Sequence, residues 1–295
     1  MPNTTQLHLP CGPVKAALTD NLIHARGIPY ATAARFQPPE PTETWTIPLD
    51  CTARAPICPQ LPSRLGSVMG LGLLDQIAAP RCGDPANLTL AGQSAGADSI
   101  VCMMAAEGTR GLFHWVILLS PPLGKLHGRA ETRARLAEKA ETLMTKDPRE
   151  MTTAELLDLQ KKLLLDRVWG RHMLFAPAFG AYPLPSENAV ESKIVETARG
   201  VPVLVRWTAH DGRPFASMSG PLCSLYSMPF SSVSTAACQA GCASTTCSFD
   251  WGAQDNPLQA CHTIDIQFVL GAPGAWEKPM LQGAMPKTSF VWVKR

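Results

Sequence analysis

The fold of this 295-residue chain is decided by Gly83-Asp-Pro-Ala-Asn-Leu-Thr-Leu-Ala-Gly-Gln-Ser-Ala-Gly-Ala97. This stretch predicts a short apolar strand over 87–91, a tight turn over 92–96 and a helix over 97–107. Small residues two positions before and two positions after Ser94 let the strand turn sharply into the helix, so that the serine hydroxyl stands clear of the backbone. The helix N-terminus also places partial positive charge where an oxyanion would form. The stretch therefore predicts a nucleophilic serine at a strand-to-helix elbow.

The same stretch resembles the active-serine signature of the type-B carboxylesterases, the family that includes cholinesterases and fungal lipases. Other blocks resemble that family in the same order, namely Gly27-Ile-Pro-Tyr30, Arg35-Phe-Gln-Pro-Pro39, Leu71-Gly-Leu-Leu-Asp-Gln76 and Gly111-Leu-Phe-His-Trp-Val-Ile-Leu-Leu-Ser120. The resemblance implies an α/β-hydrolase, with a mostly parallel central sheet flanked by helices, as one domain over 1–295. It also implies a small-molecule carboxylic ester as substrate and no cofactor.

One departure from the family lies just before the elbow. Ser67-Val-Met-Gly70 runs directly into Leu71, where the family carries a long segment with central strands and a His-Gly-Gly-Gly-type turn. No His-Gly-Gly occurs in this chain. The resemblance therefore implies an internal deletion and a sheet that lacks some central strands.

The same departure affects the predicted oxyanion hole. One donor is expected to be the backbone N–H of Ala95, the residue after the nucleophile. The other donors would come from the missing turn, and losing one donor costs about a hundred- to a thousandfold in turnover. Gly70 and Gly72 could supply substitute amides, although a glycine at such a junction is more often only a bend.

Two partners for Ser94 follow it in the order that α/β-hydrolases use, the acid and then the histidine. Asp211 follows the β-branched run 201–207 and occupies the position of the acid in a segment that resembles the family's Asp-Glu-Gly motif, with aspartate in place of glutamate. The alternative is a turn aspartate before Gly212. His262 lies in a segment, 257–271, that resembles the family's histidine block, and it is the candidate base.

The remaining histidines are weaker candidates for the base. His210 fits a turn residue or a neighbour of the site, and His114 fits a structural histidine that leads into a strand. The others have no carboxylate or serine motif nearby, and they are His8, His24, His127 and His172.

The rest of the chain predicts elements around this site. Apolar runs predict strands over 115–120, 201–207 and 244–249, and a short helix or turn over 265–270. Residues 1–65 are rich in proline and predict surface strands and loops. Helical spacing over 129–146 and 153–167, with Thr153 as N-cap, predicts a lid-like insertion over 125–170, or simply amphipathic helices packed on the core.

Composition excludes several classes of partner. Hydrophobic residues make up 45% and charged residues 17% of the chain, and the net charge is +2. This balance predicts a packed core and gives no electrostatic reason to expect nucleic acid or an anionic membrane as partner. No apolar run has the length of a membrane span, and the first residues do not form a signal peptide, so we expect a cytoplasmic protein.

The ten cysteines show no repeating framework. Cys58 resembles a family position that pairs with a Glu-Asp-Cys motif, but that motif is absent, so we expect a free thiol. Cys238, Cys242 and Cys247 cluster without C-x-x-C spacing or a histidine ladder, and we expect no metal site there.

Three hypotheses remain for function. The first is a serine carboxylic-ester hydrolase that uses Ser94, His262 and Asp211. The second is a non-catalytic relative that keeps the scaffold as an interaction surface. The third is the product of an internally deleted gene that folds poorly, because removing central strands exposes sheet edges.

Overall fold

The structure, a computed structural model, describes residues 3–20, 22–55, 58–61, 86–165, 174–214, 243–253, 255–269 and 279–281. By their contacts these residues divide into two compact units, one made of residues from 3–61 and 143–162 and the other of residues from 86–142 and 163–281. The segment 66–82 and Cys238, which carry several of the expectations above, lie outside the described residues.

The first unit contains the N-terminal strands. β1 (Thr4–Leu9), β2 (Gly12–Thr19) and β3 (Leu22–His24) pair antiparallel, and β6 (Leu49–Asp50) adds to β2 in parallel. β4 (Ala31–Thr32) and β5 (Glu40–Pro41) form a separate antiparallel pair. The alternation of β2 buries Val14 and Ala16 completely. The strands predicted within 1–65 are confirmed, while one domain over 1–295 stays a prediction.

The two predicted helices after the elbow are confirmed as α3 (Arg129–Leu143) and α4 (Thr153–Leu165). The predicted N-cap at Thr153 is wrong by one residue, because Thr152 caps α4. Its N–H and Oγ1 donate to Glu155 Oε2 at 2.7 and 2.9 Å, and the Glu155 N–H donates back to Thr152 Oγ1 at 3.3 Å. This reciprocal pair is a capping box. The ammonium group of Lys146, followed by the two bonds that Thr152 donates to the carboxylate, lowers the pKa of Glu155 to about 2.

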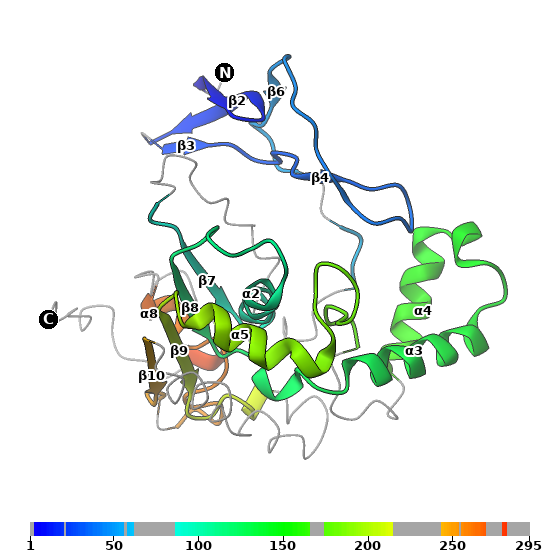
Figure 1. Cartoon of the computed structure of the whole chain (residues 1–295), viewed down its shortest axis with the longest axis vertical. Helices are drawn as coiled ribbons and strands as arrows, with labels where there is room; N and C mark the ends of the chain where they lie inside the picture. Colours follow the sequence, from blue (N-terminus) through cyan, green and yellow to red (C-terminus); the bar gives the residue numbers. More distant parts are fainter. Residues whose placement is uncertain are drawn as a thin grey trace, which may run out of the picture. The chain divides into compact units, whose positions relative to one another are not determined.

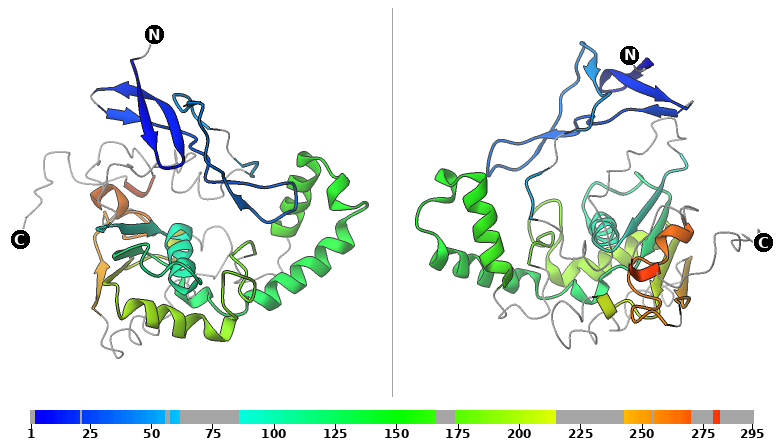
Figure 2. Two further views of the ribbon diagram at one scale, coloured as in Figure 1. Left: turned by 45° about the horizontal axis from the view of Figure 1, so that its top comes forward. Right: turned by 180° about the vertical axis from the view of Figure 1, so that it is seen from behind.

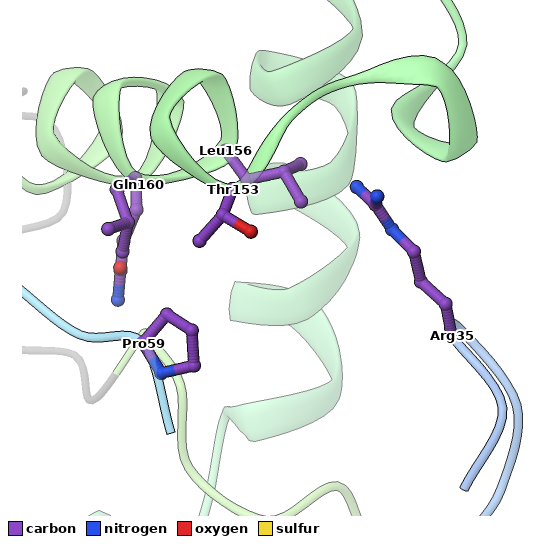
Figure 3. A pocket seen from close by; sticks show the side chains of 6 residues that line it. Arg35, Pro59, Thr153, Leu156 and Gln160 are labelled. Atoms are coloured by element: carbon purple, nitrogen blue, oxygen red, sulfur yellow. The ribbon is translucent and has the colours of Figure 1, made fainter. Parts of the chain in front are cut away.

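A hollow of about 380 Å³ lies within the first unit, beside the N-terminal half of α4. Figure 3 shows the side chain of Arg35 directed toward the α4 side of this hollow. Its guanidinium group donates to the carbonyl oxygens of Met151 and, at 3.4 Å, of Pro148. The lining residues are Arg35, Pro59, Thr153, Leu156, Leu157 and Gln160.

The second unit is built on a parallel sheet (Figure 1). Its strands are β7 (Thr89–Gln93), β8 (Trp115–Leu119), β9 (Val203–Thr208) and β10 (Ser244–Phe249), in the order β10-β9-β8-β7. The predicted strands are confirmed, with β7 beginning two residues later than expected. β8 and β9 are the interior strands, and within the described residues β7 pairs with β8 alone.

Helices cover both faces of this sheet. α2 (Ala95–Ala105) and α5 (Val190–Ala198) pack against each other and share a core with Val203 and Val205 of β9. Arg206, which alternates with Val205, points to the other face and pairs with Asp265, next to α8 (Ile266–Val269). Figure 2 shows α2 and α5 together beside the sheet from two further directions. The predicted α/β-hydrolase architecture, a parallel sheet flanked by helices, is therefore confirmed.

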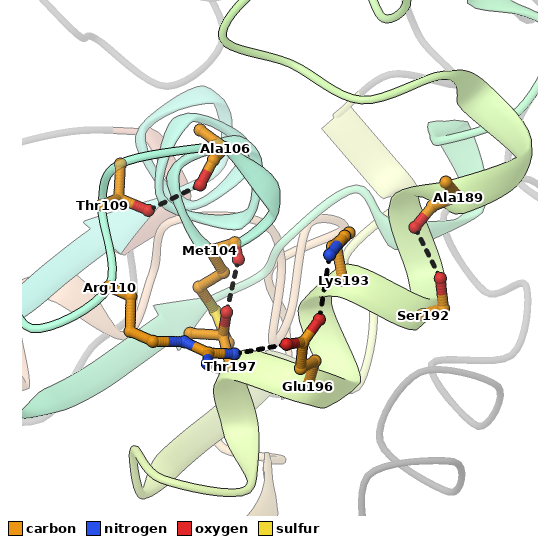
Figure 4. Close-up of polar contacts among 9 residues, drawn as sticks. All are labelled: Met104, Ala106, Thr109, Arg110, Ala189, Ser192, Lys193, Glu196 and Thr197. Atoms are coloured by element: carbon orange, nitrogen blue, oxygen red, sulfur yellow. Dashed lines mark hydrogen bonds and ion pairs between the residues drawn. The ribbon is translucent and has the colours of Figure 1, made fainter.

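Polar contacts connect α2 and the loop that follows it to α5 (Figure 4). Thr197 Oγ1 donates to the carbonyl oxygen of Met104 at 2.7 Å, and the guanidinium group of Arg110 lies 2.6 Å from Glu196. Short 3-10 turns complete the second unit at Leu123–Lys125, Glu187–Ala189 and Pro279–Leu281, and Pro148–Glu150 forms one in the first unit. None of the helices in the described ranges is both long and apolar enough to cross a membrane.

Candidate active site

Ser94 lies at the turn between β7 and α2, as the sequence predicts. Its backbone has φ 54° and ψ −118°, a conformation that residues other than glycine rarely adopt and that costs energy. Two hydrogen bonds hold it in place: the Ser94 N–H donates to the Leu119 carbonyl at 2.9 Å, and the Asp98 N–H donates to the Ser94 carbonyl at 2.9 Å. The serine thus ends the β7–β8 ladder and begins the helix at once.

The two small residues that flank this turn have different roles. A Cβ added at Gly92 would lie 2.6 Å from the carbonyl carbon and oxygen of Gly96, a distance that real Cβ atoms do not adopt. A Cβ added at Gly96 would meet no atom within 4 Å in the structure. The tight turn therefore requires a residue without a side chain at Gly92, whereas the structure leaves room for a side chain at Gly96.

Ala95, the predicted oxyanion donor, is the first residue of α2 and is exposed. The first N–H groups of a helix have no intrahelical acceptor, and the helix dipole adds partial positive charge there. The amide of Ala95 is thus free of the helix ladder beside Ser94. Gly70 and Gly72, the candidate substitutes for the missing donors, lie outside the described residues.

Asp211 lies in the turn after β9, buried with 4% of its surface exposed. Its Oδ1 accepts hydrogen bonds from Ser120 Oγ at 2.7 Å, from Thr208 Oγ1 at 2.6 Å and from His262 Nδ1 at 3.1 Å. Burial works to raise the pKa of this carboxyl group, but the charge of His262 and the three hydrogen bonds outweigh it and hold the pKa below its usual value. Asp211 is therefore ionised at neutral pH, as the orienting acid of a triad must be.

Two of these donors were missed by the sequence reasoning. Ser120 directly follows β8 and has φ 46°, so its side chain leaves the strand direction and reaches the turn after the neighbouring strand. Thr208 is the last residue of β9, three positions before the acid. Both are hydroxyl residues at the carboxyl ends of adjacent strands, where the side chains of a parallel sheet meet. That position was the signal that could have identified them.

His262 lies in a loop that is hydrogen-bonded to the turn that contains Asp211. The His210 N–H donates to the Ala260 carbonyl at 2.8 Å, and His210 forms a parallel bridge with Cys261. Gln259 and Thr263 both have positive φ, 45° and 72°, which lets the loop curl around the imidazole. With 1% of its surface exposed, His262 is held inside the protein.

The second nitrogen of His262 faces the elbow. Its Nε2 lies 3.0 Å from the side-chain nitrogen of Gln93, the residue directly before Ser94. The structure thus brings Asp211 and His262 into contact and places Gln93 of the elbow beside Nε2 of the imidazole. Gln93 was not singled out from the sequence.

A buried ion pair supports the same region. Arg206 of β9 lies 2.8 Å from Asp265, which is completely buried three residues after His262, and its guanidinium group stacks 5.0 Å from the ring centre of Phe249. Burial raises the pKa of Asp265 against the opposing effect of Arg206. The pair connects β9, which leads into the turn of Asp211, to the segment that follows His262.

Other histidines are accounted for differently. His114 Nδ1 accepts from the Leu88 N–H at 3.2 Å, which confirms a structural role before β8. Burial lowers the pKa of His210, and its Nδ1 is buried without a hydrogen-bond partner in the described structure.

Cys58 is a free, exposed thiol, as expected. Across the described ranges no three His, Cys, Asp or Glu side chains form a metal-binding group, and Cys238 and Cys242 lie outside them.

Comparison with known proteins places these features in context. The profile of the Carboxylesterase family matches residues 67–246. A probable N-octanoylanthranilate hydrolase of Rhodococcus erythropolis is 30% identical over 254 residues, covering 74% of this chain and 56% of that protein. A para-nitrobenzyl esterase of Bacillus subtilis (strain 168) is 26% identical over 314 residues, covering 69% and 62%. The chain thus spans less than two thirds of the length of these relatives.

The fold is also found among solved structures. A thermophilic pNB esterase matches 90% of this chain and 84% of its own with a TM-score of 0.63 and 19% identity. At that identity the likeness establishes the fold alone.

Proposed function

The chain belongs to the carboxylesterase family, and from this premise we propose that it hydrolyses carboxylic esters through an acyl-enzyme formed on Ser94. One observation supports the proposal above all others. His262 Nδ1 lies 3.1 Å from Oδ1 of the buried Asp211, although the two residues are 51 positions apart in the sequence. An imidazole oriented by an ionised carboxylate is the arrangement that a serine nucleophile requires.

In the acylation step, Ser94 Oγ attacks the ester carbonyl carbon while His262 Nε2 takes the hydroxyl proton. Asp211 accepts the hydrogen bond from Nδ1–H, and its charge stabilises the imidazolium that forms. The Ala95 N–H donates to the developing oxyanion. The C–O bond to the alcohol then breaks, and the imidazolium gives its proton to the departing alcohol oxygen.

Deacylation repeats these steps with water as the nucleophile. His262 takes a proton from the water as its oxygen bonds to the acyl carbon. The bond between the acyl carbon and Ser94 Oγ then breaks, and the proton passes from His262 to Ser94. The carboxylic acid is released and the resting hydroxyl is restored.

We expect this reaction to be slow. The chain carries no His-Gly-Gly turn, which in the family supplies the further oxyanion donors. Loss of one such donor costs about a hundred- to a thousandfold in turnover. Gly70 and Gly72 are the proposed sources of replacement amides.

The names of the relatives suggest where to begin with substrates. One refers to an N-acyl anthranilate and the other to a para-nitrobenzyl ester. Each compound joins an acyl group to an aromatic partner. We therefore propose activated aromatic esters, such as short p-nitrophenyl esters, as the first substrates to assay.

The test uses a fluorophosphonate probe and a pair of matched variants. The wild-type chain should be labelled on Ser94 and should hydrolyse p-nitrophenyl acetate. Ser94→Ala should lose both labelling and hydrolysis. Ser99→Ala, which changes an exposed serine on the same helix, should keep both.

Three other outcomes would remove the proposal. Hydrolysis that survives in Ser94→Ala would show a different nucleophile. A well-folded wild-type chain that is neither labelled nor active would favour the non-catalytic scaffold. A chain that aggregates and shows no cooperative thermal transition would favour the poorly folding deletion product.

A further inference from the structure

The side chain of Gln93 contacts Nε2 of His262, the nitrogen that accepts the Ser94 proton in the proposed reaction. Gln93 is the last residue of β7, is paired with Leu119 in the parallel ladder and is joined directly to Ser94. Its side-chain nitrogen lies 3.0 Å from His262 Nε2. Because the imidazole has 1% of its surface exposed, bulk water does not compete for this nitrogen.

The donor and acceptor of this contact follow from the other side of the ring. An ionised carboxylate can only accept hydrogen bonds, so His262 Nδ1 carries the proton that is donated to Asp211. In the neutral imidazole Nε2 then carries the lone pair and accepts from the amide N–H of Gln93. Both ring nitrogens are satisfied, as buried polar groups require.

We propose that Gln93 is a positioning residue that holds the base in its resting state and must release Nε2 before Ser94 can transfer its proton there. This inference rests on the proposed esterase function. The same lone pair cannot accept fully from the amide of Gln93 and from the hydroxyl of Ser94. The contact therefore stabilises the substrate-free site relative to the transition state.

The contact also opposes the charge that forms during the reaction. Once Nε2 is protonated, an amide N–H directed at it becomes repulsive, and Gln93 must turn away or present its oxygen. A carboxylate at this position would do the opposite, because it would accept from the protonated Nε2 and stabilise the imidazolium before substrate arrives. Among the described residues, Asp211 is the charged group in contact with the imidazole, the Arg206–Asp265 pair lies in the same region three residues further along the chain, and the charge of Arg213 acts on the neighbouring Cys261 and His210.

Two substitutions at this position should therefore act in opposite directions. Gln93→Met keeps the length of the side chain and removes the competing amide, so the second-order rate constant of fluorophosphonate labelling at pH 8 should rise about 2- to 10-fold, the range of one hydrogen bond. Gln93→Glu should label more slowly at pH 7 and should shift the acid limb of the pH–rate profile to higher pH. Gln160→Met, the same change on α4, should leave rate and profile unchanged.

The possible outcomes distinguish a failure of the role of Gln93 from a failure of the proposed esterase function. Suppose that Gln93→Met melts at the wild-type temperature but its Ser94 is labelled at the wild-type rate or more slowly. That result would overturn the role of Gln93 without contradicting the proposed esterase function. If Gln93→Met is destabilised, the pH–rate profile of Gln93→Glu provides the test instead. An acid limb at the same pH as in the wild type would also overturn the role of Gln93. Absence of Ser94 labelling in every variant, wild type included, would instead overturn the proposed function.

Discussion

Replacing Ser120 by alanine removes one of the donors that meet at Asp211 Oδ1. The bond is 2.7 Å long, and both residues are almost completely buried, with 3% and 4% of their surfaces exposed. A hydrogen bond to a charged acceptor contributes about 1.5–3 kcal/mol to stability. Because Thr208 and His262 still donate to the same oxygen, the carboxylate is not left unpaired, and we expect the free energy of unfolding at pH 7 to fall by about that range.

The sign of the pH dependence follows from the pKa of Asp211. This pKa is lowered in the folded protein, and the bond from Ser120 is among the causes. A carboxyl group with a lowered folded pKa contributes stability that is present above its unfolded pKa, about 3.9, and is lost as pH falls through the folded pKa. The difference in stability between the wild type and Ser120→Ala should therefore be greatest at neutral pH and should shrink below about pH 4.

Urea unfolding, followed by tryptophan fluorescence at pH 7 and at the most acidic pH where the wild type stays folded, measures both quantities. Ser99→Ala is the matched control, because it removes a hydroxyl from an exposed position and should cost less than about 0.5 kcal/mol. A loss below about 0.5 kcal/mol in Ser120→Ala at pH 7 would refute the reasoning. So would a loss that is the same at both pH values.

Two further pairs of substitutions test local features of the fold. Gly92→Ala should strongly lower the melting temperature, because the new Cβ would clash with the backbone of Gly96. Gly96→Ala should melt at or above the wild-type temperature, because a Cβ there meets no atom within 4 Å. Equal melting temperatures for the two variants would contradict the geometry of the elbow. Thr152→Ala should lower the free energy of unfolding of its unit by about 0.5–2 kcal/mol, because it removes the capping box with Glu155. Thr153→Ala should lower that free energy distinctly less in the same urea titration. The reverse order would identify Thr153 as the N-cap.

Much of the sheet could be predicted from the sequence, because its strands are compact apolar runs with clear boundaries. The strand predicted over 244–249 has the bounds of β10, and the one predicted over 115–120 ends one residue late. β7 is displaced by two residues because the strand ladder continues through Gln93 to the serine. Apolar periodicity therefore located the elements, while backbone pairing set their ends.

The candidate site was only partly predictable. Asp211 and His262 could be proposed from motifs, and they are in contact in the structure. The position of Ser120 at the carboxyl end of a strand was a signal for it, but its contact with Asp211 and that of Gln93 with His262 could not be predicted, because they join segments that are 91 and 169 residues apart. Ser120 further depends on a positive φ that no local preference of serine predicts.

The strand order of the second unit has a consequence for how the protein is made. Neighbours in β7-β8-β9-β10 are also neighbours along the chain, so each strand can dock on its predecessor as it leaves the ribosome. Ser94 and Ser120 are then in place early, and Asp211 joins them with the turn after the third strand. His262 is synthesised only after β10, so a growing polypeptide carries the proposed nucleophile, Ser94, long before it acquires the proposed base.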